Sequence, residues 1–281
     1  MTRLLAGALL VLALASPARA ADYAGPIIDA HSHVPNAKAI DDYVAAMKRH
    51  NIARVVLLGV GGVQKDDVAW IGAAAKKYPG LVIPGAPVAD PTDAGVAQAA
   101  AAVDTLKARA LGEVHGRQVS RKIDRDPASF GKLFEMAASR GIPVVIHHEL
   151  TDAAVKPLDA ALAAHRKTVV IIAHGGEGPP ARVEGLLARN PNLYVDLSGM
   201  HYQRTPKLAT ETGPLDPEWK AVIEKHPDRF LIGIDVWAAR LFEAQTLDKL
   251  MAWTRRILGA LKPDVAERVA AKNAAALFKL E

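Results

Sequence analysis

The sequence predicts an α/β fold, a parallel eight-stranded (β/α)8 TIM barrel that follows a cleaved signal peptide. Eight short apolar, β-rich segments recur along the chain, and helical segments lie between them. Their starts are 24 to 37 residues apart, which leaves room for one strand and one helix in each unit. No glycine-rich phosphate-binding motif follows the first segment, so eight units favour a closed barrel over an open, doubly wound sheet.

The first twenty residues have the pattern of a secretory signal peptide. A basic residue, Arg3, precedes an apolar run from Leu4 to Ala15, and Ala-Arg-Ala ends the segment at residue 20. The apolar run is short for a bilayer span, so we expect cleavage after Ala20 and no membrane anchor after processing. Residues 1–20 are thus the signal peptide, and 21–281 form a single barrel domain of a periplasmic or secreted protein.

Composition narrows the chemistry and the partners. There is no cysteine, so no disulfide is expected and any metal must be held by His, Asp and Glu. The formal charge of +5 falls to +3 when the two arginines of the leader are removed. Basic residues are scattered along the chain, and we therefore expect a small-molecule substrate and no nucleic-acid partner. A homo-oligomer remains open.

The eight predicted strands are near-continuous runs of Val, Ile and Leu, typical of parallel strands covered by helices. In order they are GPIIDAHSH from residue 25, ARVVLLGV from 53, GLVIPGAPV from 80, RALGEVHG from 109, GIPVVIHHE from 141, KTVVIIAHGG from 167, PNLYVDLSG from 191 and DRFLIGIDVW from 228.

Helical patterns separate these strands. The range 126–140 has clear start and stop signals for a helix, with Asp126 as the N-cap, Pro127 in the first helical position and Gly141 ending the helix. The longest irregular stretch, 199–216, is expected to be a loop that faces the substrate. Other predicted helices are 39–50, 66–78 and 94–108.

Candidate metal ligands gather at the C-terminal ends of five predicted strands. His31 and His33 are two residues apart on the first strand, so both imidazoles lie on one face and Ser32 on the other. In a barrel the C-terminal strand ends meet at one mouth, where active sites assemble. Six buried polar groups without a cation would be costly there. The six ligands are His31, His33, Glu113, His147, His174 and Asp235.

Five motifs span the chain from the first strand to the C-terminus. They are Asp29-Ala-His31-Ser-His33, Pro143-Val-Val-Ile-His147, Ile172-Ala-His174-Gly-Gly, Gly233-Ile-Asp235 and Asn273-Ala-Ala-Ala-Leu-Phe278. With these motifs in this order, the sequence resembles the amidohydrolase superfamily, and specifically the branch of amidohydrolase-related metal-dependent hydrolases.

The resemblance implies a role for each ligand. His31, His33 and His147 match metal ligands, and His174 matches a histidine that binds a second metal or polarises the substrate. Asp235 matches the aspartate that holds the metal and shuttles a proton.

The fourth strand departs from the pattern of many two-metal members. No lysine lies between Lys107 and Lys122, so a carboxylated bridging lysine is not expected. Glu113 and His115 share a strand face, and the sequence leaves open which of them points at the metal. We favour Glu113, with one or two ions both open.

The resemblance implies a metal-dependent hydrolase that activates water to attack a carbonyl or phosphoryl centre in an amide, lactone, ester or phosphoester. Zn²⁺ is the expected cofactor, although nitrogen and oxygen ligands also suit other divalent metals. Two alternatives are a non-oxidative decarboxylase of an aromatic or unsaturated acid, and a metal-binding barrel without catalysis. Expected substrate contacts are Arg204, Trp237 and Arg240.

Overall fold

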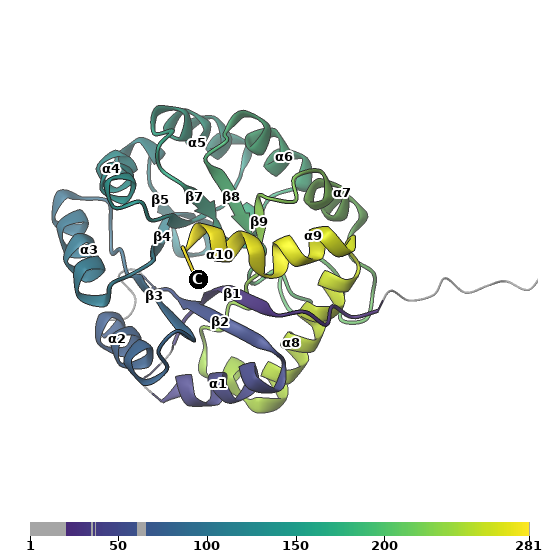
Figure 1. Cartoon of the computed structure of the whole chain (residues 1–281). Coiled ribbons are helices and arrows are strands. Elements are labelled where there is room, and N and C mark those ends of the chain that lie inside the picture. The colour runs from purple at the N-terminus through teal and green to yellow at the C-terminus, as the bar shows by residue number, and fades with distance from the viewer. Residues whose placement is uncertain (1–20, 35, 37, 61–65, 281) are drawn as a thin grey trace, which may run out of the picture.

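The computed structural model describes residues 21–34, 36, 38–60 and 66–280, so the predicted signal peptide lies outside the described residues. Eight parallel strands form one sheet in the order β1-β2-β3-β4-β6-β7-β8-β9 and curve into a barrel (Figure 1). All eight predicted strands are confirmed. Their bounds are β1 Ile27–Ser32, β2 Ile52–Leu57, β3 Val82–Ala86, β4 Ala110–Gln118, β6 Val144–His148, β7 Val170–Ile172, β8 Leu193–Asp196 and β9 Phe230–Leu231.

The barrel closes between its last strand and its first. The Ala30 amide donates to the Ile232 carbonyl at 3.0 Å, and the Asp235 amide donates to the His31 carbonyl at 2.9 Å. The His33 amide donates to the carbonyl of Val236, which lies just beyond Asp235, at 2.8 Å. The chain after β9 therefore runs along β1, and it carries Asp235 to the same mouth as His31 and His33.

Helices surround the barrel and cover its outer face (Figure 1). The four predicted helices are confirmed, although a 3-10 turn at Pro127–Phe130 opens the fourth. Asp126 caps this turn by accepting from the Ala128 amide at 3.0 Å, and Gly141 ends the helix with φ 62°. The helices are α1 Ala39–Arg49, α2 Asp67–Lys77, α3 Asp93–Leu106, α4 Gly131–Arg140, α5 Asp152–Ala164, α6 Pro180–Arg189, α7 Pro217–Lys225, α8 Ala244–Gly259, α9 Pro263–Glu267 and α10 Asn273–Leu277.

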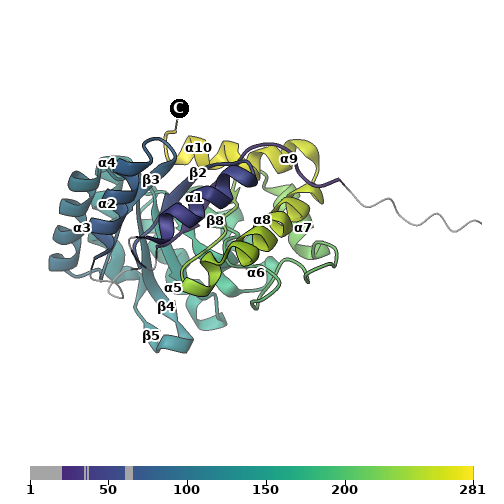
Figure 2. The same cartoon turned by 90° about the horizontal axis from the view of Figure 1, so that it is seen from below.

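The C-terminal helices cover one end of the barrel (Figures 1 and 2). Ala274 and Phe278 are buried in the same apolar cluster as Ile28 and Ala30 of β1. The Asn273 side chain donates to the backbone carbonyls of Pro227 and Phe230, both at 2.8 Å. The motif at residues 273–278 therefore seals the N-terminal end of the barrel and leaves the C-terminal end for the site. None of the described helices is long and apolar enough to cross a membrane.

A short hairpin that the sequence did not predict projects from the open end (Figure 2). β4 continues to Gln118, turns through Val119–Arg121, and pairs antiparallel with β5, which spans Ile123–Asp124. Across the barrel, the stretch 197–216 contains no helix or strand, so the irregular loop predicted at 199–216 is confirmed. The hairpin and this loop stand over the C-terminal ends of the strands.

Candidate metal centre

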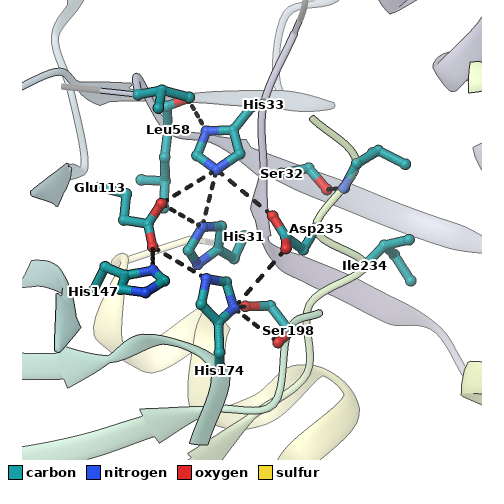
Figure 3. A network of polar contacts seen from close by, with 12 residues as sticks. His31, Ser32, His33, Leu58, Glu113, His147, His174, Ser198, Ile234 and Asp235 are labelled. Carbon is teal, nitrogen blue, oxygen red and sulfur yellow. Dashed lines mark hydrogen bonds and ion pairs between the residues drawn. The ribbon is translucent and has the colours of Figure 1, made fainter. Parts of the chain in front are cut away.

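A cavity of about 300 Å³ opens at the C-terminal end of the barrel. Side chains from five strands or from the residues just after them form its floor: His33, Glu113, His147, His174 and Asp235. His31 lies in the same cluster and is fully buried (Figure 3). The structure thus brings together all six residues that the sequence singled out as metal ligands.

Asp29 fixes the local course of β1 below the cluster. Pairing with β2 shifts register between Asp29 and Ser32. The Asp29 carboxylate accepts from the His31 amide at 3.1 Å, the Ser32 hydroxyl at 2.5 Å, the Ile234 amide at 2.8 Å and the Tyr43 hydroxyl. Burial raises the pKa of this carboxyl to about 6, and these hydrogen bonds oppose the shift. As predicted, His31 and His33 face the cluster while Ser32 points away from it, towards Asp29.

In His31 and His33 the outer ring nitrogen, Nδ1, contacts a hydrogen-bond acceptor outside the cluster. The inner nitrogen, Nε2, faces the cluster. Nδ1 of His31 lies 2.9 Å from the Asp196 carboxylate, and Nδ1 of His33 lies 2.8 Å from the Leu58 carbonyl. Both partners are acceptors, so each Nδ1 carries a proton and each neutral ring presents a lone pair on Nε2. These two Nε2 atoms are 3.1 Å apart. Two ligand nitrogens on a tetrahedral zinc ion are separated by about 3.3 Å.

Glu113 lies between two pairs of imidazoles (Figure 3). Its Oε2 is 3.7 Å from Nε2 of both His31 and His33. Its Oε1 is 3.0 Å from Nδ1 of His147 and 3.2 Å from Nε2 of His174. Each carboxylate oxygen therefore faces its own pair of ring nitrogens, an arrangement that suits a carboxylate shared between two cations.

His174 shows the same orientation of its ring. Its Nδ1 faces the carbonyl and the hydroxyl of Ser198, at 2.9 and 3.0 Å. The Ser198 hydroxyl itself donates to Asp196, so it can accept from the imidazole. In the neutral ring Nδ1 is then the protonated nitrogen and Nε2 turns a lone pair towards Glu113, whereas in the charged ring Nε2 donates to Glu113. Outer hydrogen bonds of this kind typically orient metal-binding histidines.

The carboxylates of the cluster favour a positive charge at its centre. Burial lowers the pKa of His31, but the negative charges of Asp196 and Glu113 outweigh it and raise that pKa well above its usual value. Burial raises the pKa of Glu113, but the charge of His31 and hydrogen bonds from His147 and His174 hold it well below its usual range. A proton on His31 meets this requirement in the metal-free protein, and a divalent cation fits the same donors.

Asp235 stands at the edge of the cluster. Its Oδ1 is 3.7 Å from Nε2 of His33, while its Oδ2 accepts from Nη1 of Arg204. A Cβ on Gly199, where φ is 66°, would lie 2.5 Å from Nη1 of Arg204 and 2.6 Å from Oδ2 of Asp235. Glycine at residue 199 therefore permits this ion pair on steric and on backbone grounds.

The two candidates on the fourth strand both lie in the site, and Glu113 as the metal ligand stays a prediction. Glu113 lies at the centre of the cluster, whereas Nε2 of His115 is 4.0 Å from Oε2 of Glu113. Both side chains line the cavity. Burial lowers the pKa of His115 to about 4, and the charges of His147 and Arg121 contribute, so His115 is neutral near pH 7.

The three expected substrate contacts have different positions. Arg204 and Trp237 line the cavity. Arg240 is exposed on the 3-10 turn Ala239–Phe242 and is not among the residues that line it.

Sequence reasoning missed Glu177. Its Oε1 is 3.7 Å from Nε2 of His147 and 3.6 Å from Nη2 of Arg204. It follows His174-Gly-Gly, and residues 174 to 177 all have positive φ, which folds the acid back towards the site. An acid three residues after a strand-end histidine was the available signal. Gln118, Ser120 and Arg121 of the hairpin also line the cavity and were missed with that hairpin.

Comparisons with known proteins agree with this architecture. An amidohydrolase of Burkholderia multivorans with bound zinc superposes with a TM-score of 0.64 at 16% identity, covering 92% of this chain and 100% of that one. An uncharacterised TIM-barrel protein of Bordetella bronchiseptica gives 0.63 at 17% identity, with 91% and 99% covered. Dihydroorotase of Campylobacter jejuni gives 0.63 at 14%, with 96% and 87% covered. At these identities the likeness shows the fold.

The family follows from the sequence comparison. No curated protein matches the chain significantly. A model of the amidohydrolase family, in contrast, matches residues 16–280, nearly the whole chain. The protein therefore belongs to the amidohydrolase family.

Proposed function

We propose that the protein is a metal-dependent hydrolase whose six clustered side chains hold two divalent cations, with Zn²⁺ preferred. The observation that carries this proposal is the set of inner ring nitrogens on His31, His33 and His174. In its neutral form each ring offers a lone pair and faces another acceptor at 3.1 or 3.2 Å. Acceptors this close repel one another unless a proton or a metal ion lies between them, and the same donor atoms suit a divalent cation. The zinc in the Burkholderia multivorans amidohydrolase supports the choice of metal.

Each residue has a place in this proposal. His31, His33, Glu113 and Asp235 would hold one ion, and Glu113, His147 and His174 a second. When bound, a divalent cation eases deprotonation of water and polarises a carbonyl or phosphoryl oxygen.

Asp235 accepts the proton of the attacking water and returns it to the leaving group. Its Oδ1 is turned towards the cluster, while Arg204 holds its Oδ2. His174, fixed by Ser198, would hold the cation that supplies positive charge beside the substrate oxygen as negative charge develops there. Residues of the hairpin and of the loop at 199–216 border the cavity, and they position the substrate over these groups.

The test is an activity screen of the purified protein across amides, lactones, esters and phosphoesters, before and after treatment with a chelator. We expect hydrolysis of at least one class, loss on chelation, and recovery when Zn²⁺ is restored. Release of carbon dioxide from aromatic acids, measured in parallel, reports the decarboxylase alternative. Hydrolysis that survives complete metal removal would contradict the proposal.

A further inference from the structure

The rim of the cavity has an unusual composition. Among the described residues, the exposed large hydrophobic side chains are Val119 and Trp237, with 58% and 43% of their surface exposed. Val119 lies on the hairpin turn, next to the cavity-lining Ser120, and Trp237 lines the cavity from beyond β9. Of the two, Trp237 lies in the cavity lining, and its indole offers a flat apolar face to a planar ligand.

Cations at this rim differ in whether they already have a carboxylate partner. Arg204 pairs with Asp235 and Glu177, and Arg117 of β4 pairs with Asp124. Arg121 also lines the cavity, and within the described part of the chain no carboxylate lies within ion-pair distance of it. The charge of Arg121 is therefore available to a ligand.

The acids that line the cavity do not compete for this charge. Glu113 is engaged by His147 and His174 at the floor. Asp235 is held by Arg204. Among the cavity-lining side chains, Arg121 is thus a charged group without an oppositely charged partner, and a guanidinium binds a carboxylate through two parallel hydrogen bonds.

We propose that the substrate carries a carboxylate, which Arg121 binds, beside a planar apolar portion that packs on Trp237. This inference rests on the proposed function, because it assigns the substrate class of the same site. Arg121 is a specificity-determining residue supplied by the hairpin, and it selects acids over neutral compounds of the same shape.

Binding of two small probes to the zinc-loaded protein tests this assignment by titration calorimetry. Benzoate and benzamide share a ring and differ in charge, and measuring the binding of either probe requires no turnover. We expect benzoate to bind the wild type more tightly. In Arg121→Gln the dissociation constant for benzoate should rise roughly tenfold, the effect of one charged hydrogen-bonding partner at a solvent-accessible site, with little change for benzamide. In Trp237→Ala both probes should weaken together.

Lys122→Gln is the matched control, because it removes an exposed positive charge one residue away that does not line the cavity. A cation in the centre attracts benzoate in every variant, so the comparison between variants decides. Equal benzoate affinity in wild type and Arg121→Gln, equal loss in Lys122→Gln, or no measurable benzoate binding to the wild type would overturn the proposal. Failure of the hydrolase proposal would appear instead in the activity screen.

Discussion

Asp235 depends on a neighbour that has no side chain. Gly199 lies against both Asp235 and Arg204, and its backbone has the left-handed conformation. Any side chain at residue 199 would enter the space in which the guanidinium meets the carboxylate. The orientation of the proposed proton acceptor is thus set by three residues together, two of them in the loop at 199–216.

Gly199→Ala should reduce turnover about 100-fold, the scale expected when a catalytic group is misplaced by about 1 Å. Steady-state kinetics on the substrate found by the screen measures it. Gly80→Ala is the control, since Gly80 also has positive φ, 74°, but nothing lies within 4 Å of its added Cβ. Backbone strain should lower the free energy of unfolding of both variants by about 1–2 kcal/mol, and steric overlap should add to this in Gly199→Ala, yet only Gly199→Ala should lose activity. Equal activity in the two variants would argue against this role of the ion pair.

At the level of single residues, the sequence was informative where a chemical type recurs at strand ends. His31, His33 and Asp235 could be placed at one mouth from strand periodicity and barrel closure alone. Glu177 could not, because its approach to His147 depends on four successive residues with positive φ. Arg240 likewise lies on a 3-10 turn and outside the cavity lining, and no periodic pattern in the sequence predicts that turn.

Among the secondary-structure elements, α2 begins with a buried acid. Asp67 accepts from the Val60 amide at 2.7 Å and so ties the start of α2 to the end of β2. Burial raises the pKa of this carboxyl to about 7, although the hydrogen bond opposes the shift. The folded state therefore prefers the protonated acid, in contrast to the usual surface aspartate.

Asp67 should make stability depend on pH in a defined window. Because its folded pKa lies above the unfolded value of 3.8, its contribution is fully present below pH 3.8 and is lost as the pH rises to about 7. The free energy of unfolding of the wild type, relative to Asp67→Asn, should fall across this window by about 1–2 kcal/mol after allowance for partial solvent access. Urea titrations at pH 4, 5.5 and 7.5 measure this difference. A difference that is flat with pH would refute the shifted pKa.

Elements were predictable in proportion to their regularity. All eight barrel strands and the four ranges predicted as helices are present, because each has a buried apolar run or a helical period. The β4–β5 hairpin escaped prediction because β5 has two residues, one of them exposed, and pairs through polar side chains such as Arg117 and Asp124. It is also the element that supplies Arg121 to the cavity.

At the scale of the whole molecule, the two ends of the barrel differ: one is filled by apolar side chains and the other carries the polar cluster. The C-terminal segment fills one end with Ala274 and Phe278, and the polar cluster occupies the other. The number of repeating units was enough to predict a closed barrel. The manner of closure was not, because β9 is only two residues long and the chain after it completes the ring through backbone hydrogen bonds to β1.

Export remains a prediction for the molecule as a whole. The basic, apolar and small-residue pattern of residues 1–20 predicts cleavage after Ala20. N-terminal sequencing of the protein from the periplasm or the medium of a producing bacterium should begin at Ala21. Recovery of the protein only from the cytoplasm, with Met1 intact, would show that this interpretation is wrong.

Metal content is the measurement that tests the central claim most directly. The account predicts that the wild-type protein, loaded with Zn²⁺ and freed of excess ion, retains two ions per chain by mass spectrometry of the metal. Glu113→Gln keeps the shape but removes the charge between the two imidazole pairs, so this variant should lose at least one ion. In Glu184→Gln, which changes a partly exposed acid on α6 that pairs with Lys225, both ions should be retained. Equal metal content in the wild type and Glu113→Gln would contradict the account.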